Sequence, residues 1–85
     1  MITGVALFNT NTGELVSLPN PNRHNHVISK MFKEMKVRPL RQDGWIQGFI
    51  DDQANFLDRE QAAEHALECK QIKVRLDILF SEDLW

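Results

Sequence analysis

The sequence predicts a small α+β domain in which two helices pack on one face of an antiparallel or mixed β-sheet, with the element order ββαββαβ. Two apolar runs flank an Asn/Thr/Gly connection near the start of the chain. Apolar residues then recur three and four positions apart, and a capped helix follows a later β-prone run. The 85 residues suffice for one domain, residues 1–85, with one modest core.

The first two elements are predicted to form a β-hairpin. Ile2–Phe8 and Glu14–Leu18 are rich in apolar and β-branched residues, and the polar connection between them contains typical turn formers. Pro19 and Pro21 end the second strand, because proline has no N–H group to donate to a sheet.

A helix is predicted from Asn22 or Arg23 to about Lys36, because its apolar residues have the spacing of one helical face. This stripe consists of His24, Val27, Ile28, Met31, Phe32 and Met35. We expect it to cover the sheet, and the alternative is a partner-binding groove. Val37–Gly44, which contains Pro39, is predicted to be a loop.

The next part of the chain is predicted to form the third strand, Trp45–Asp51, then a turn, and then a short apolar strand at Phe56 and Leu57. Asp58 then begins a helix. Its carboxylate can accept N–H groups of the first turn, and Gln61 can reach back to the Asp58 amide, which makes a capping box.

This second helix has an alanine-rich side and ends near Cys69. Beyond it, apolar and charged residues alternate over Val74–Phe80, which predicts a final, half-buried strand. Small side chains on the helix allow close approach to the sheet.

Composition excludes several classes of protein. The formal net charge of −2 gives no general attraction for duplex nucleic acid. No apolar run approaches the length of a membrane span, and the first residues lack the basic start of a signal peptide. Cys69 is the single cysteine, so the chain has no internal disulfide. We therefore expect a cytoplasmic protein with no membrane partner and no cofactor.

The histidines make weak metal-ligand candidates. His24 and His26 share a face only if this segment is extended, because on a helix they lie about 200° apart. His65 is the third imidazole, and no metal-ligand spacing accompanies it. The sequence therefore predicts no metal site.

Arg23 and Arg59 each occupy the first turn of a predicted helix, where a guanidinium and the helix end attract anions. If the two helix starts share one edge of the sheet, both arginines would converge with His24 and His26 on one anion. The preferred interpretation is internal pairing, of Arg59 with Ser81–Asp83 and of Arg23 with an acidic neighbour.

Catalysis has little support in the sequence. Cys69 falls near a helix C-terminus, where the helix dipole disfavours a thiolate, and no serine has a glycine elbow beside it. Glu82 and Asp83 are adjacent acids with no sign of a shared cleft. These observations favour a protein that is not an enzyme and identify no catalytic residue.

Three ordered blocks resemble a family of small, largely uncharacterised bacteriophage-encoded proteins. The blocks are Arg23–Ile28 (RHNHVI), Gly48–Ala63 with its Gly-Phe and Phe-Leu-Asp-Arg stretches, and Leu79–Trp85 (LFSEDLW). The chain differs from the family pattern at Lys70, where glycine is usual, and at Phe80, where tyrosine is usual. Loss of that glycine is expected to remove a natural helix C-cap.

The resemblance, the small size, the acidic balance and the absence of catalytic spacing together favour an interaction protein that acts in the host cytoplasm by binding a host protein and modulating or inhibiting it. Trp45 and Trp85 are the expected partner-binding residues. The alternative is a binder of, or minimal enzyme acting on, a nucleotide-like anion through Arg23, His24 and Arg59. Homodimerisation through an open sheet edge or Trp85 remains a further alternative.

Overall fold

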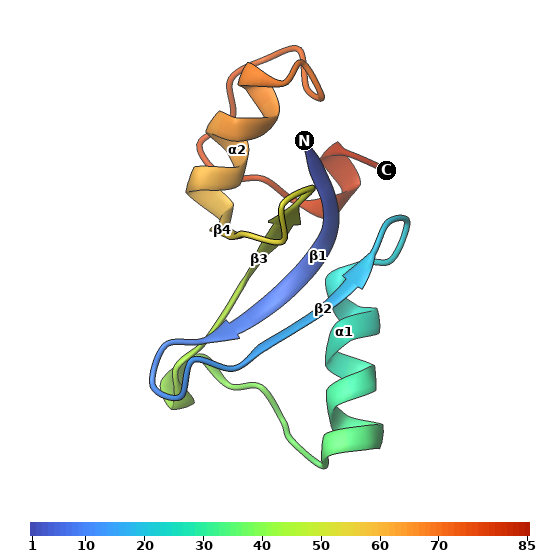
Figure 1. The fold of residues 1–85 in the computed structure, drawn as a ribbon, viewed down its shortest axis with the longest axis vertical. Coiled ribbons are helices and arrows are strands. Elements are labelled where there is room, and N and C mark those ends of the chain that lie inside the picture. The colour runs from blue at the N-terminus through green and yellow to red at the C-terminus, as the bar shows by residue number, and fades with distance from the viewer.

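The computed structural model describes residues 1–85 and contains one four-stranded antiparallel sheet (Figure 1). The strand order is β2-β1-β3-β4. The strands are β1 (Ile2–Asn9), β2 (Leu15–Pro19), β3 (Trp45–Asp51) and β4 (Phe56–Asp58). The predicted hairpin and third strand are confirmed to within one residue, and the predicted short strand at Phe56 and Leu57 forms β4.

Both helices contribute to one core on one face of the sheet. Helix α1 (His24–Lys30) packs against β1 and β2, whereas α2 (Arg59–Glu68) packs against β3 and β4 (Figure 1). Phe49 from the middle of β3 is fully buried between them. The core also contains Val5, Leu7, Val27, Met31, Ala62, Ala63 and Ala66. No helix has both the length and the apolar character that crossing a lipid bilayer requires.

The start of α2 confirms the predicted capping box. An Asp58 carboxylate oxygen accepts the Gln61 N–H at 2.8 Å, and the Gln61 side-chain oxygen accepts the Asp58 N–H at 3.0 Å. The end of the helix differs from expectation. Lys70 adopts the left-handed conformation, with φ 62°, and the Gln71 N–H bonds to the Ala66 carbonyl at 2.8 Å. A C-cap therefore forms without the glycine that usually occupies this position.

The predicted strand over Val74–Phe80 is wrong. This segment runs without regular structure to a 3₁₀ turn at Ser81–Asp83. Leu79 is fully buried, whereas Val74 is 65% exposed, so burial does not follow the alternation. The main-chain partner of Leu79 is the carbonyl of Arg59, at 2.9 Å, and not a strand edge. The observed element order is therefore ββαββα.

The predicted first helix is confirmed as a continuous helical segment, but only part of its stripe is buried. Helix α1 continues as a π-helical turn, Met31–Met35. Met31 is fully buried, whereas Phe32 is 56% exposed. Successive side chains of a helix point in different directions, so Phe32, which directly follows the buried Met31, lies well away from the line of residues that faces the core.

Candidate functional site

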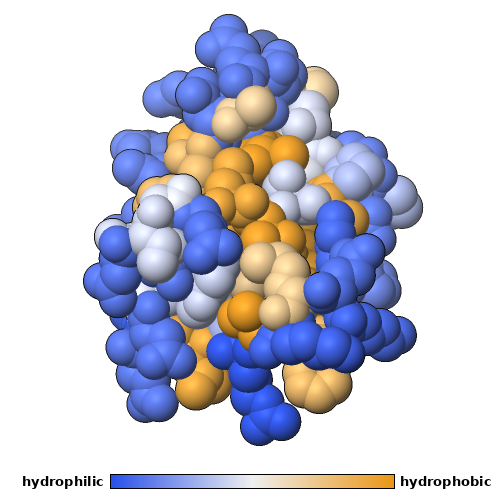
Figure 2. Space-filling view, turned by 60° about the horizontal axis from the view of Figure 1, so that its bottom comes forward, coloured by the Kyte–Doolittle hydropathy of each residue, from blue (hydrophilic) through white to orange (hydrophobic).

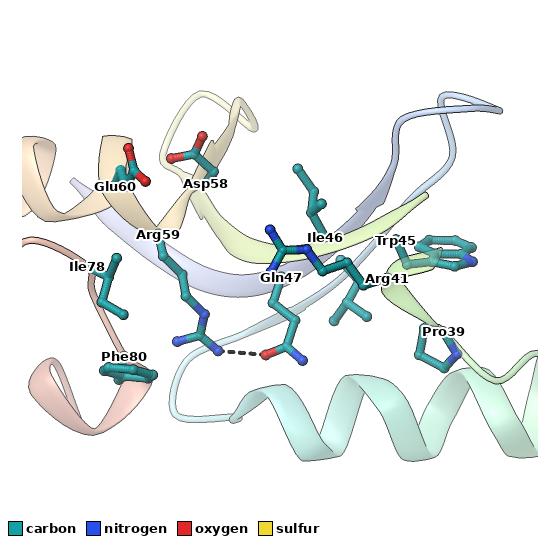
Figure 3. A pocket seen from close by; sticks show the side chains of 11 residues that line it. Pro39, Arg41, Trp45, Ile46, Gln47, Asp58, Arg59, Glu60, Ile78 and Phe80 are labelled. Carbon is teal, nitrogen blue, oxygen red and sulfur yellow. Dashed lines mark hydrogen bonds between the residues drawn. The ribbon is translucent and has the colours of Figure 1, made fainter. Parts of the chain in front are cut away.

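An open cleft of about 560 Å³ lies between the first turn of α2 and the loop that precedes β3 (Figure 3). Its lining includes Pro39, Trp45, Gln47, Arg59, Ile78 and Phe80. The volume falls in the range of small-ligand pockets. Whether this cleft can bind a charged ligand depends on whether its charged side chains already form bonds within the protein.

Arg59 is positioned by the pairing of β3 with β4. Gly48 of β3 lies opposite Asp58 of β4. A Cβ atom on Gly48 would collide with the carbonyl oxygen of Leu57 and the ring of Phe56. Glycine at this position therefore lets β4 approach closely, and the Asp58 cap then begins α2 with Arg59 at the edge of the cleft.

The guanidinium of Arg59 is held by groups of the protein itself. One nitrogen donates to the Leu79 carbonyl at 3.0 Å and another to the Gln47 side-chain oxygen at 2.6 Å (Figure 3). The group also lies over the Phe80 ring, 4.6 Å from its centroid. Partial burial lowers the pKa of Arg59, and the charge of Glu82 opposes this shift. The internal partners are thus Leu79 and Gln47, and not the predicted Ser81–Asp83.

Arg23 binds the C-terminal segment to the start of α1. Its Nη2 donates to the main-chain oxygen of Trp85 at 2.6 Å, and its Nη1 lies 3.5 Å from a Glu82 carboxylate oxygen. The Trp85 indole N–H in turn donates to the Asn22 carbonyl at 2.8 Å. The Glu82 side chain is 68% exposed, so water screens this ion pair and the main-chain bonds matter more.

His24 is a core residue and His26 a capping residue. The Nε2 of His24 lies 2.6 Å from the Gly48 carbonyl, which can only accept, so Nε2 carries the proton. Its ring meets Phe49 edge-on, with centroids 5.1 Å apart. His26 Nδ1 accepts the Arg23 N–H at 2.9 Å. The two imidazoles are therefore engaged in different places and do not form a shared site.

Burial of His24 predicts that the fold loses stability in mild acid. Burial lowers the pKa of His24 below its ordinary value of 6.5, the bond to Gly48 opposes the shift, and the charge of Arg59 adds to it. As the pH falls below 6.5, the unfolded chain takes up a proton that the folded chain refuses. The free energy of unfolding should then decrease, by at most about 1.4 kcal/mol per pH unit.

Urea denaturation at several values between about pH 7.5 and 5.5 measures this slope. The His24→Gln variant, whose amide can still donate to Gly48, should show a shallower slope. Replacement of the exposed His26 by glutamine is the matched control. Equal slopes for the native protein and His24→Gln would contradict the assignment.

A second, smaller hollow brings together three of the sequence-predicted site residues. Arg23, His24 and Arg59 line it, together with Phe80 and Glu82. The starts of α1 and α2 therefore lie at the same edge of the sheet, as binding of one anion by both arginines would require. However, a Glu82 carboxylate oxygen lies 3.5 Å from the Arg23 guanidinium, and the charge of Glu82 also acts on Arg59, so the hollow contains its own counter-charge.

The two tryptophans lie mainly inside the protein. Trp45 is only 6% exposed, and Trp85 is half-buried where Asn22 and Arg23 bind it. Their positions leave little indole surface for contact with another molecule.

The end of the first helical segment and the loop after it form a basic part of the chain with exposed apolar side chains, which include Phe32 and Met35 of the stripe that could alternatively form a partner-binding groove. We define it as the basic segment, Lys30–Arg41. It contains five of the ten basic residues of the chain and one acidic residue, Glu34. Its exposed apolar side chains are Phe32 at 56%, Met35 at 37% and Leu40 at 40%. The excess of basic over acidic residues in this segment is visible in the sequence. The exposure of Phe32 is not, because it depends on which side of the helical segment packs against the sheet.

Comparison with known proteins places the whole chain in one family. The model of a family described as "Phage T4 y16D protein" matches residues 1–85. No curated protein and no solved structure matches the chain.

Proposed function

The chain belongs to the phage T4 y16D protein family, and we propose that it is a non-catalytic accessory protein. It acts in the host cytoplasm, where it binds a host protein and modulates or inhibits it. The observation that carries this proposal is the basic segment, in which large apolar side chains stand exposed between cations.

The charge of the basic segment contrasts with that of the rest of the protein. Outside Lys30–Arg41 the chain has five basic and eleven acidic residues. A surface of this kind attracts an acidic partner and orients it, because opposite charges steer two proteins together before they dock.

The apolar side chains favour a protein partner over a nucleic acid. Binding to phosphates needs cations alone, whereas aromatic residues, methionine and arginine are enriched in the centres of protein interfaces. Phe32 and Met35 have this character and lie within the basic segment. Figure 2, which brings the lower end of Figure 1 forward, shows an apolar band bordered by hydrophilic residues.

The state of the arginines supports a role that is not catalytic. Arg59 uses both terminal guanidinium nitrogens in internal hydrogen bonds, and Arg23 uses Nη2. His24 is buried and bonded to a carbonyl, so it is poorly placed to exchange protons with a substrate. The partner we propose has an acidic surface with an apolar hollow that receives Phe32.

Site-specific photocrosslinking in host lysate tests this proposal. A photoreactive phenylalanine at position 32 should capture one host protein, whereas the same residue at position 74 should not. Val74 is the matched control because it is 65% exposed and lies outside the basic segment. With the captured protein purified, Lys33→Glu/Lys36→Glu should weaken binding by about ten-fold or more, and salt should weaken it too.

Lys70→Glu/Lys73→Glu changes the charge by the same amount outside the basic segment and should leave the affinity unchanged. The proposal fails if positions 32 and 74 capture the same proteins, or if both double variants bind alike. Capture that disappears after nuclease treatment would identify a nucleic acid as the partner instead.

A further inference from the structure

The cleft beside the first turn of α2 contains a cation that the protein does not bind itself. Arg41 lines the cleft, and both ion pairs of the structure involve other residues. Figure 3 shows the Arg41 guanidinium reaching from the loop before β3 towards Gln47, with no hydrogen bond to another residue shown there. Arg59, on the other side of the cleft, already binds Leu79 and Gln47. Arg41 is therefore the cation of the cleft that is free to bind a ligand.

We propose that the cleft binds a small organic acid, in which one carboxylate is attached to an aromatic or similarly flat apolar body. The carboxylate would pair with Arg41, because a planar guanidinium can donate a pair of parallel hydrogen bonds to it. Gln47 can donate a further bond. Its side-chain oxygen is occupied by Arg59, which leaves the N–H groups of its amide for the ligand.

The cleft exists because the helices leave part of their face of the sheet uncovered. Trp45, Gln47 and Phe49 alternate along β3 and therefore point to the same face. Phe49 is fully buried and Trp45 is 6% exposed, whereas Gln47 between them is exposed. The floor of the cleft is thus a polar position in an otherwise buried row, open to a molecule from solvent.

Apolar side chains surround this polar position and would receive the body of the acid. Ile78 and Phe80 lie on the side of α2 and are 42% and 44% exposed. Pro39 lies across the cleft, on the loop that carries Arg41 (Figure 3). A flat apolar body between these side chains would remove exposed apolar surface from water, which favours binding. An apolar lining with a few directed polar groups is typical of small-molecule sites.

The turn that carries Arg41 is held to the β1–β2 hairpin. It is a 3₁₀ turn, Arg41–Asp43, and the Asp43 carbonyl accepts side-chain N–H groups of Asn9 at 3.3 Å and Asn11 at 3.1 Å. Gly44 ends the turn with φ 95°, a conformation that glycine adopts without strain. A ligand would therefore find the main chain of Arg41 already in place, which reduces the entropy lost on binding.

The carboxylates of the cleft do not neutralise Arg41. Asp58 and Glu60 also line the cleft, and the Asp58 carboxylate accepts the Gln61 N–H. Figure 3 shows both carboxylates pointing away from the Arg41 guanidinium. They repel further negative charge on the side of α2, so one free cation and an acidic border favour a ligand with a single carboxylate over a multiply charged phosphate.

Titration of the ¹⁵N-labelled protein with naphthylacetate, followed by heteronuclear NMR, tests the site. We expect one acid per chain, with saturable shifts of the Gln47 side-chain amide and of the Arg41 Nε–H signal. The Trp85 indole signal should not move, because that group lies outside the cleft and donates to Asn22. Naphthylacetamide keeps the body without the charge, and acetate keeps the charge without the body. Each should bind at least about ten-fold more weakly than naphthylacetate.

Two variants show whether Arg41 provides the charge. Arg41→Gln should weaken the binding of naphthylacetate by about ten-fold or more. Arg38→Gln is the matched control, because Arg38 is an exposed arginine of the same basic segment that lies over Phe32 and outside the cleft. The purified protein is tested alone, so the result does not depend on whether a host protein binds the basic segment.

Three results would overturn the proposal. They are the absence of saturable shifts at Gln47, equal affinities for naphthylacetate and naphthylacetamide, and equal losses of affinity in Arg41→Gln and Arg38→Gln.

Discussion

Replacement of Phe49 by alanine is expected to lower the free energy of unfolding by about 3–5 kcal/mol. Phe49 is fully buried in the centre of β3 and touches the ring of His24. Removing the ring would lose its transfer free energy and leave a cavity between two helices that are fixed to the sheet by other contacts. A chain of 85 residues typically has about 4–13 kcal/mol of stability, so this single change removes a large part of it.

Chemical denaturation at low temperature measures the effect, and circular dichroism reports whether the variant still folds. Phe32→Ala is the matched control, because it deletes the same ring from an exposed position and should change the stability by less than about 0.5 kcal/mol. If the two variants are destabilised equally, the assignment of Phe49 to the core and of Phe32 to the surface is wrong.

The features that the sequence predicted well depend on neighbouring residues. The hairpin and the capping box are examples. In the capping box, Asp58 and Gln61 are three residues apart, and each side chain accepts the main-chain N–H of the other residue. The strand predicted over Val74–Phe80 failed because alternation describes only a preference. A strand also needs a partner edge, and here the Arg59 carbonyl provides the main-chain contact instead.

For the candidate sites too, local features could be predicted from the sequence, whereas contacts between distant residues could not. Two arginines at helix starts can be recognised from sequence, and the structure does bring Arg23 and Arg59 to one hollow. Their bonding partners could not be recognised, because Leu79 and Trp85 are 20 and 62 residues away in the chain.

Replacement of Arg59 by alanine is expected to lower the free energy of unfolding by about 2 kcal/mol. The variant loses two charge-assisted hydrogen bonds and the stacking on Phe80. It also leaves the carbonyl of the buried Leu79 without its side-chain donor. The part of the chain around Leu79 should then detach more readily from α2, which hydrogen exchange of the Leu79 amide can detect.

Arg59→Lys separates the bonding role of the guanidinium from its charge. Lysine keeps the positive charge but cannot reproduce the planar pair of bonds to Leu79 and Gln47, so it should restore only part of the stability. Arg75→Ala is the matched control, since it removes an exposed arginine and should have little effect.

Thermal shift with nucleoside mono- and triphosphates decides between the internal role of Arg59 and the anion-binding alternative. If Arg59 serves the fold, nucleotides should leave the melting temperature of the native protein unchanged. If they instead raise it, and Arg59→Ala abolishes the rise while Arg59→Lys retains it, the charge of Arg59 serves a ligand. The small hollow beside Arg23 and His24 would then be a binding site, because only a group that binds the folded state can stabilise it in this way.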